Sequence, residues 1–470
     1  MTRVVIVGGG PGGYEAALVG SQLGGDVTLI DTDGLGGSAV LTDCVPSKTL
    51  IATAEVMSEV KGAAELGVRF GASAESSAEA LVSVDLAAVN RRVLGLARQQ
   101  SEDIVERLEK EGVRIVVGRG RLEGTDRVVA ETAEGEHSFP ADFALVSTGA
   151  RPRILPEAVP DGERILTWTQ VYGLTEVPER LIVVGSGVTG AEFASAYGLL
   201  GSYVILVSSR DRVLPGEDAD AAQVLEDVWA ERGLEVLSKS RAKSVVRQGD
   251  EVVVTLTDGR TVTGSHCLLA VGSIPNTADM GLAEAGVALD RGGFVEVDRV
   301  SRTTARGVYA AGDCTGVLML ASVAAMQGRI AMWHSLGDAV SPLDLKSVSS
   351  NVFTTPEIAT VGASQTQVDS RAVRAMSATL PLKGNARAKM QGIHEGFVKL
   401  FCLPATGIIV GGVVVSPRAS ELIHPVAVAV AERITVDQFA HDFTVYPSLS
   451  GSLAEVARRL HGHSVDQLTT

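Results

Sequence analysis

The chain has 470 residues, of which 45% are hydrophobic and 21% charged, a composition typical of a globular protein of about three domains. Its 56 acidic and 41 basic side chains give a net charge of −15, which argues against general binding to nucleic acids or anionic membranes. The sequence contains no run of about eighteen apolar residues, so we expect no transmembrane segment. The four cysteines, Cys44, Cys267, Cys314 and Cys402, lack zinc-type spacing. We therefore expect a cytoplasmic protein without a metal site.

A glycine-rich loop follows the first predicted strand. The β-branched run Arg3–Val7 is typical of a buried parallel strand, and a helical pattern covers Tyr14–Leu23. The glycines between them are Gly8, Gly10 and Gly13. A second strand, Val27–Ile30, ends at Asp31, about twenty residues beyond the loop, where a carboxylate accepts hydrogen bonds from a ribose. Strand, GxGxxG loop, helix and acid together predict a dinucleotide site, with the pyrophosphate at the helix N-terminus.

A second copy of this pattern predicts a second dinucleotide. The strand Leu181–Val184 leads into another GxGxxG loop and a helix. Its glycines are Gly185, Gly187 and Gly190.

Three further strands end at glycine turns that we regard as cofactor contacts. Phe143–Val146 precedes STGARP, a related AVGSIPNT begins at Ala270, and GVYAAGDCT begins at Gly307. The candidate residues in these turns are Thr148, Gly149, Gly272, Gly312 and Asp313.

The order of these motifs resembles the flavoprotein disulfide reductases, the family of dihydrolipoamide dehydrogenase and glutathione reductase, over essentially the whole chain. The resemblance implies an α/β fold with two Rossmann-like, three-layer domains and a C-terminal α+β dimerisation domain. It implies that the first loop and Asp31 hold the ADP part of FAD, that Asp313 bonds the ribityl chain, and that the second loop holds NAD(P)H. The expected domains are a split FAD domain (1–150 and 279–345), an NAD(P) domain (151–278) and a dimerisation domain (346–470).

The strand Tyr203–Val207 ends at Ser208, where NAD enzymes of this layout carry an acid that repels a 2′-phosphate. A hydroxyl with Arg210 and Arg212 nearby can accept a 2′-phosphate through charge-assisted hydrogen bonds. We therefore predict that NADPH serves at least as well as NADH. Alternatively, both arginines are ordinary solvated loop charges.

The resemblance places Lys48 and Glu192 beside the flavin N5 as an ion pair. Pairing is expected there, because a buried lysine or glutamate is costly without a partner of opposite charge. Alternatively, both are surface charges.

The stretch Gly36–Lys48 matches the family's redox motif with one sulfur removed. A thiol relay needs two sulfurs, and the resemblance puts the inner one at Cys44 and the outer one where Ala39 stands. Whether Cys44 has a catalytic role stays open.

From about Ser347, alternating strand patterns predict an antiparallel sheet with helices, ending in an amphipathic helix over Ser452–Leu460. The resemblance implies a homodimer in which this domain completes the partner's active site through a His–Glu pair. Tyr446 and Gly451 occupy those two positions, and a phenol is a poor thiol base at neutral pH. Tyr446 either donates a hydrogen bond to an acceptor carbonyl or fills the interface.

The outer sulfur and the His–Glu pair, which this chain lacks, are the groups that pass electrons from the flavin to a disulfide. The residues that let NAD(P)H reduce FAD are all present. We therefore expect a flavoprotein oxidoreductase that reduces a small planar acceptor, such as a quinone, directly and lacks disulfide reductase activity. The alternatives are a soluble pyridine nucleotide transhydrogenase and a non-enzymatic protein that retains the fold.

Overall fold

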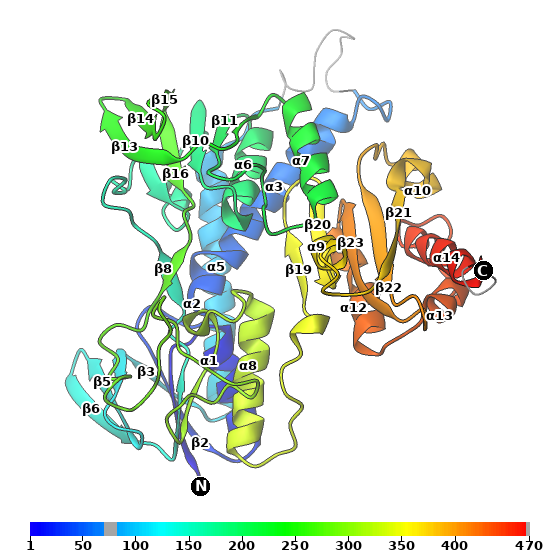
Figure 1. Ribbon diagram of the computed structural model, residues 1–470. Coiled ribbons are helices and arrows are strands. Elements are labelled where there is room, and N and C mark those ends of the chain that lie inside the picture. The colour runs from blue at the N-terminus through cyan, green and yellow to red at the C-terminus, as the bar shows by residue number, and fades with distance from the viewer. Residues whose placement is uncertain (70–81, 467–470) are drawn as a thin grey trace. The chain divides into compact units, whose positions relative to one another are not determined.

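The computed structural model describes residues 1–69 and 82–466, and its chain divides into two compact units (Figure 1). The first consists of Met1–Thr49, Asn90–Arg153 and Gly272–Asp344. The second consists of Leu50–Val89, Ile154–Val271 and Leu345–Thr470. Most of both stretches expected to form the flavin domain therefore falls in the first unit, with breaks after 153 and before 272 instead of at 150 and 279.

A five-stranded parallel sheet, ordered β18-β7-β1-β2-β3, forms the centre of the first unit. Its strands are β1 (Arg3–Val7), β2 (Asp26–Asp31), β3 (Arg114–Val117), β7 (Phe143–Val146) and β18 (Val308–Ala310). The middle strands are rich in Val, Ile and Leu and are buried, as expected for a parallel sheet covered on both faces. The strands predicted at the first glycine loop are confirmed.

Smaller antiparallel sheets complete the first unit. One contains β4 (Arg119–Leu122), β5 (Arg127–Thr132) and β6 (Gly135–Pro140); the other pairs β8 (Ala150–Pro152) with β17 (Ser273–Pro275). The helices α3 (Cys44–Gly62) and α5 (Leu86–Lys110) cross the boundaries between the units along the chain, and α2 (Gly37–Leu41) precedes α3.

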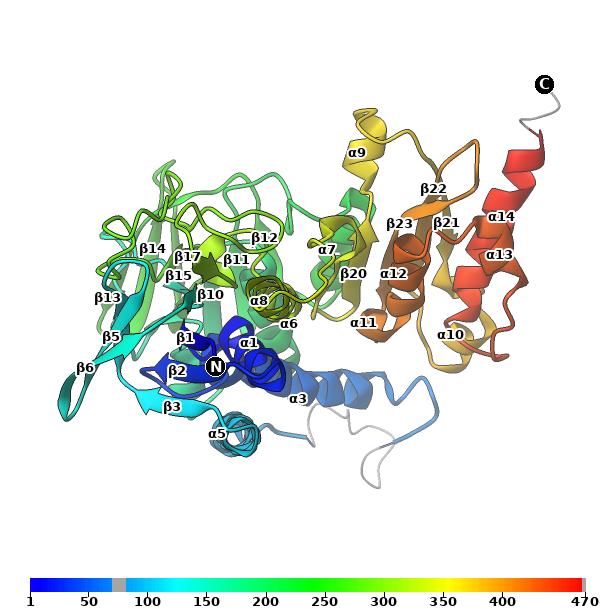
Figure 2. The ribbon, with the colours of Figure 1, turned by 90° about the horizontal axis from the view of Figure 1, so that it is seen from below.

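Helices α1 (Pro11–Gln22) and α8 (Ala321–Ser335) lie side by side in the first unit (Figures 1 and 2). Helix α1 begins at Pro11, three residues before the predicted start, because proline's fixed φ suits the first helical position. A β-carbon on Gly328 of α8 would lie 2.0 Å from the carbonyl oxygen of Gly12, so only glycine permits this approach. The Arg329 guanidinium and the Glu15 carboxylate, 2.8 Å apart, add an ion pair between the same helices.

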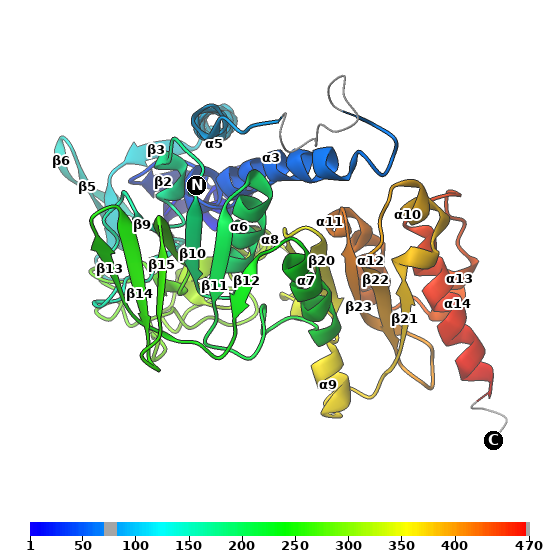
Figure 3. The ribbon, with the colours of Figure 1, turned by 90° about the horizontal axis from the view of Figure 1, so that it is seen from above.

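The second unit contains another parallel sheet, ordered β12-β11-β10-β16-β9 (Figure 3). Its strands are β9 (Ile165–Thr167), β10 (Arg180–Val184), β11 (Tyr203–Val207), β12 (Glu235–Leu237) and β16 (His266–Leu269). Helices α6 (Val188–Leu200) and α7 (Ala219–Glu231) belong to this part, as does an antiparallel sheet of β13 (Ala242–Gln248), β14 (Glu251–Leu256) and β15 (Thr261–Gly264).

The C-terminal part of the second unit is a five-stranded antiparallel sheet, which confirms the predicted pattern. In spatial order its strands are β19 (Ser349–Val352), β20 (Glu357–Gly362), β23 (Ile409–Ser416), β22 (Phe397–Cys402) and β21 (Met376–Pro381). The helices are α9 (Gln365–Asp369), α10 (Ala386–Met390), α11 (Ala419–Leu422), α12 (His424–Ala431), α13 (Val436–His441) and α14 (Gly451–Asp466). The apolar face of α14 contributes Leu453, Val456 and Leu460 to the core.

A buried ion cluster connects this antiparallel sheet to α7. Lys399 on β22 is 2% exposed, and its ammonium lies 2.8 Å from the carboxylate of Asp218 and 2.7 Å from that of Asp220. Asp218 also caps α7 through hydrogen bonds from two backbone N–H groups. Among the described residues, no helix is both long and apolar enough to cross a membrane.

We predict that Gly328→Ala destabilises the protein by about 2 kcal/mol or more, because the added methyl group must push α8 away from α1. Gly95→Ala in α5 is the matched control, since a β-carbon there meets nothing within 4 Å. It should stabilise the helix by about 0.5–1 kcal/mol. Chemical unfolding of both variants tests this, and equal stabilities would contradict the packing described.

Candidate dinucleotide and acceptor sites

Backbone contacts shape the first glycine loop. Gly8 has φ 102°, and a β-carbon on it would lie 2.2 Å from the carbonyl oxygen of Ser147. A β-carbon on Gly13 would lie 1.8 Å from the carbonyl oxygen of Gly8. Gly10, the N-cap of α1, faces open space and carries no side-chain cap. The turn therefore leaves the positive end of α1 open to an anion, as a pyrophosphate requires.

Asp31 lies at the carboxyl end of β2 and organises the loop itself. One carboxylate oxygen accepts a hydrogen bond from the N–H of Gly9 at 2.6 Å. The other accepts from the N–H groups of Asp33 and Gly34 at 2.9 and 2.8 Å. The ribose contact expected for Asp31 stays a prediction.

The two related turns noted in the sequence pair with one another, which sequence reasoning did not anticipate. Strands β8 and β17 run antiparallel, and the hydroxyl of Thr148 donates to the carbonyl oxygen of Asn276 at 2.7 Å. The Asn276 amide donates back to the carbonyl of Thr148 at 3.0 Å, and Arg151 donates to the Asn276 side chain at 2.8 Å. Asn276 thus holds the turn that contains Gly149.

Asp313 follows β18 at another glycine turn, where Gly312 has φ 81°. The buried side chain of Gln327, which sequence reasoning missed, accepts a hydrogen bond from the N–H of Gly312 at 2.9 Å. Burial, with a smaller contribution from Asp43, raises the pKa of Asp313 to about 6. Within the described residues no hydrogen bond to its carboxylate is found, so a flavin side-chain hydroxyl would supply the missing partner.

These observations fit a flavin dinucleotide in the first unit. The uncapped start of α1 suits a pyrophosphate, and the Asp313 carboxylate suits a hydroxyl donor. The glycine loop, Asp31, the turn with Thr148 and Gly149, and Asp313 all lie at or just beyond the carboxyl ends of neighbouring parallel strands, where ligands of such sheets bind.

Cys44 begins α3 and is partly exposed, while Ala39 lies in α2. Cys267, Cys314 and Cys402 are buried free thiols. Burial raises the pKa of the Cys314 and Cys402 thiols to about 11, so neither is poised to form a thiolate. Lys48 is half-buried one turn into α3.

The second glycine loop repeats the first atom for atom in its tightest contacts. Gly185 has φ 116°, and a β-carbon on it would lie 2.1 Å from the carbonyl oxygen of Ala270. A β-carbon on Gly190 would lie 1.9 Å from the carbonyl oxygen of Gly185. Gly187 is the N-cap of α6, again without a side-chain cap. Gly272, at φ 92°, lies in the turn beyond Ala270.

The carboxyl end of β11 carries the predicted coenzyme-selective residues. Ser208 is fully buried, with its hydroxyl 2.7 Å from that of Ser186. The Arg212 guanidinium donates to the carbonyl oxygens of Pro215 and Glu217, each at 3.3 Å, and so holds its own loop. Arg210 is exposed. Of the residues predicted to meet a 2′-phosphate, only Arg210 therefore presents its charge outward.

Glu192 on α6 is 3% exposed, and its carboxylate accepts a hydrogen bond from the N–H of Phe353 at 2.9 Å. One turn along, the hydroxyl of Ser195 accepts from the N–H of Thr355 at 3.0 Å. Both contacts anchor α6 to the segment after β19, and sequence reasoning missed them. Lys48 belongs to the first unit and Glu192 to the second, so the expected ion pair stays a prediction.

The segment before α14 presents apolar side chains to solvent. Phe443, Val445 and Tyr446 are exposed, Tyr446 at 85%. Gly451 begins α14, and its N–H donates to the hydroxyl of Ser448 at 3.1 Å. These three side chains therefore form an exposed, largely apolar stretch of the C-terminal domain.

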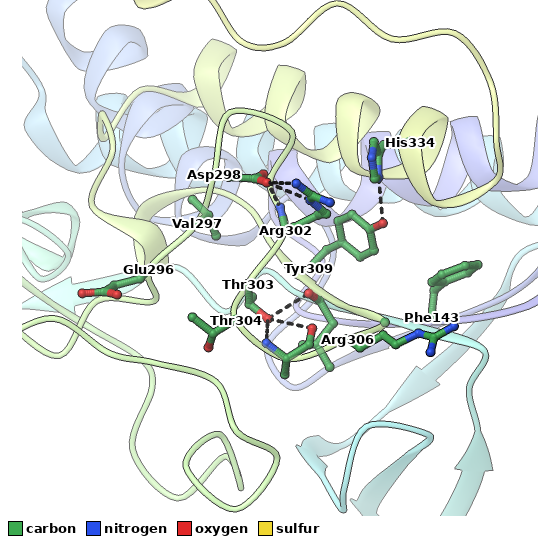
Figure 4. Close-up of a pocket in the computed structure, with 13 residues that line it drawn as sticks. Phe143, Glu296, Val297, Asp298, Arg302, Thr303, Thr304, Arg306, Tyr309 and His334 are labelled. Carbon is green, nitrogen blue, oxygen red and sulfur yellow. Dashed lines mark hydrogen bonds and ion pairs between the residues drawn. The ribbon is translucent and has the colours of Figure 1, made fainter.

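A pocket of about 640 Å³ lies at the amino ends of β7 and β18, the end opposite to Asp313 (Figure 4). Four of its polar side chains bond in pairs: Arg302 pairs with Asp298 at 2.7 Å, and the Tyr309 hydroxyl lies 2.9 Å from Nδ1 of His334. This pocket is separate from the dinucleotide turns.

For the flavin-free protein we predict a pH-dependent difference in stability between the unaltered chain and Asp313→Asn. Because folding raises the pKa of Asp313, the folded state holds its proton longer, and stability falls as pH rises from about 4 to about 6. Relative to the variant, the unaltered protein should lose about 2 kcal/mol between pH 4.5 and 7.5 in chemical unfolding. Parallel curves would show that Asp313 titrates normally.

Comparisons with known proteins agree with this architecture. The model of the pyridine nucleotide-disulphide oxidoreductase family matches residues 2–328, and that of its dimerisation domain matches residues 348–457. A Mycobacterium tuberculosis protein named NAD(P)H dehydrogenase (quinone) is 54% identical over 473 residues, which cover 98% of this chain and 94% of that protein. Dihydrolipoyl dehydrogenase 2 of Haloarcula marismortui is 32% identical, covering 99% and 98%.

Solved structures show the same fold. The crystal structure of LpdA from Mycobacterium tuberculosis is 54% identical, with a TM-score of 0.92, and the match covers 98% of this chain and all of that one. A flavoprotein disulfide reductase of Escherichia coli, RclA, matches at 22% identity and a TM-score of 0.85, covering 97% of this chain and 99% of that one, which supports the fold alone. The resemblance inferred from the motifs is confirmed, and this chain belongs to the pyridine nucleotide-disulphide oxidoreductase family.

Proposed function

We propose that this chain is a FAD-dependent oxidoreductase that takes electrons from NAD(P)H and passes them directly to a quinone or a similar small planar acceptor. The observation that carries the proposal is the single sulfur of the redox segment. The segment contains one cysteine, Cys44; Ala39 stands where the family has a second cysteine, and the other three cysteines are buried. A dithiol relay needs two sulfurs within bonding distance of each other.

Two further observations support the proposal. Tyr446 and Gly451 replace the histidine and glutamate that would activate a thiol. The Mycobacterium tuberculosis relative at 54% identity is named for quinone reduction. The losses are therefore confined to the sulfur-dependent half of the reaction.

When bound, the flavin supplies the chemistry of accepting a hydride and releasing electrons, and the protein binds and orients the flavin and the nicotinamide coenzyme. In this proposal the turns at Gly10 and Gly187 bind the two pyrophosphates, and Asp313 binds the ribityl hydroxyls. Glu192, anchored by the Phe353 N–H, would contribute its carboxylate to the edge of the flavin ring, and Lys48 would contribute its ammonium, each helping to position that edge for hydride transfer.

In this proposal the acceptor site is completed by a second copy of the chain. The exposed Phe443, Val445 and Tyr446 precede α14 in the dimerisation domain, and an apolar surface of this kind suits both a homodimer contact and an aromatic acceptor.

We predict that the purified flavoprotein reduces simple benzoquinones and naphthoquinones with NADPH or NADH. Lipoamide and glutathione disulfide should be turned over at least about a thousandfold less efficiently, because no dithiol forms. Steady-state kinetics with all four acceptors measure this.

The matched control is Cys44→Ala, which should keep quinone turnover within about threefold, since one sulfur cannot store the electron pair. Appreciable disulfide turnover by the unaltered protein would refute the proposal. Loss of quinone turnover in Cys44→Ala would show instead that the remaining thiol takes part in the reaction.

A further inference from the structure

We infer that Lys239, together with Arg210, binds the 2′-phosphate of NADPH. This inference rests on the proposed function, because it names the residues that select the coenzyme at the second dinucleotide loop. Lys239 lies just beyond β12, in a segment that none of the dinucleotide motifs includes.

A site for a 2′-phosphate needs positive charge. A 2′-phosphate carries between one and two negative charges near pH 7 and is held best by more than one cationic donor. Ser208 is fully buried with its hydroxyl bonded to Ser186, and Arg212 is committed to its own loop. Arg210 alone is therefore left at the end of β11, and a second cation must come from elsewhere.

Lys239 lies close to Arg210 in the fold. Strands β11 and β12 are parallel neighbours, so their carboxyl ends lie together at one edge of the sheet (Figure 3). The N–H of Lys239 donates to the carbonyl oxygen of Arg210 at 2.7 Å, and the N–H of Ser240 donates to the carbonyl oxygen of Ser208, also at 2.7 Å. These bonds fix Lys239 directly beside Arg210.

The side chains of Lys239 and Arg210 are both accessible to a ligand. Lys239 and Arg210 are exposed, and within the described chain neither side chain forms an ion pair. The neighbouring Arg260, by contrast, is bound to the Asp258 carboxylate and donates to the Ser240 hydroxyl at 2.8 Å. Asp211, the residue after Arg210, is an acid and is also exposed.

The backbone of Lys239 has an uncommon conformation. Its φ is 51°, a left-handed conformation that is strained for any residue with a β-carbon. Glycine or asparagine would adopt this conformation more easily. The hydrogen bond from its N–H to the carbonyl oxygen of Arg210 holds Lys239 in this conformation.

The experiment measures binding of 2′,5′-ADP and 5′-AMP to the flavin-loaded protein by calorimetry, and the KM values for NADPH and NADH in quinone reduction. Lys239→Ala should weaken 2′,5′-ADP about tenfold and raise the KM for NADPH by a similar factor, while 5′-AMP and NADH change less than twofold. Lys239→Arg should retain most of the affinity for 2′,5′-ADP. Added salt should reduce the difference between Lys239→Ala and the unaltered protein.

Lys243→Ala is the control, since it removes an equally exposed lysine from β13 of the antiparallel sheet in the same unit and should leave all four values unchanged. If the unaltered protein binds 2′,5′-ADP no better than 5′-AMP, both the use of NADPH and the role of Lys239 are overturned, although quinone reduction with NADH stands. If it prefers 2′,5′-ADP and Lys239→Ala keeps that preference, only the role of Lys239 is overturned.

Discussion

Both dinucleotide sites depend on the same backbone contact. The carbonyl oxygen of Gly8 occupies the place that a β-carbon on Gly13 would need, and Gly185 stands in the same relation to Gly190. This approach turns the chain sharply from a strand into a helix and directs the free N–H groups of that helix at the ligand. The approach of α8 to α1 through Gly328 and the turns carrying Asp313 and Thr148 surround the first of these contacts.

The sequence predicted these turns because their signals are local. The strand before each loop, the glycine spacing and Asp31 lie within about thirty residues, and the antiparallel C-terminal sheet followed from alternation. The tie between Thr148 and Asn276 joins residues 128 positions apart, and the bond from Phe353 to Glu192 spans 161. Such contacts depend on tertiary pairing, which no local pattern encodes. The hydrogen bonds from Arg212 to the carbonyl oxygens of its own loop were not predicted, because the sequence of a loop does not show whether an arginine in it binds a ligand or the backbone.

We propose that the residues at which this chain departs from the disulfide reductases change its chemistry, and the fold accommodates them. Alanine at position 39 fits within α2, and Gly451 opens α14 with a hydrogen bond to Ser448. The antiparallel sheet, the buried Lys399 cluster and the core beneath α14 remain intact. In the proposed function the fold retains its coenzyme sites, and electrons leave the flavin by a different route because a sulfur relay needs two cysteines.

The central claim is that the flavin is the sole redox centre, and a reductive titration tests it most directly. Under anaerobic conditions the flavoprotein is titrated with dithionite and with NADPH while flavin absorbance is recorded. The account predicts full bleaching at two electrons for each flavin. Uptake of four electrons for each flavin would reveal a second redox centre and would contradict direct transfer from flavin to acceptor.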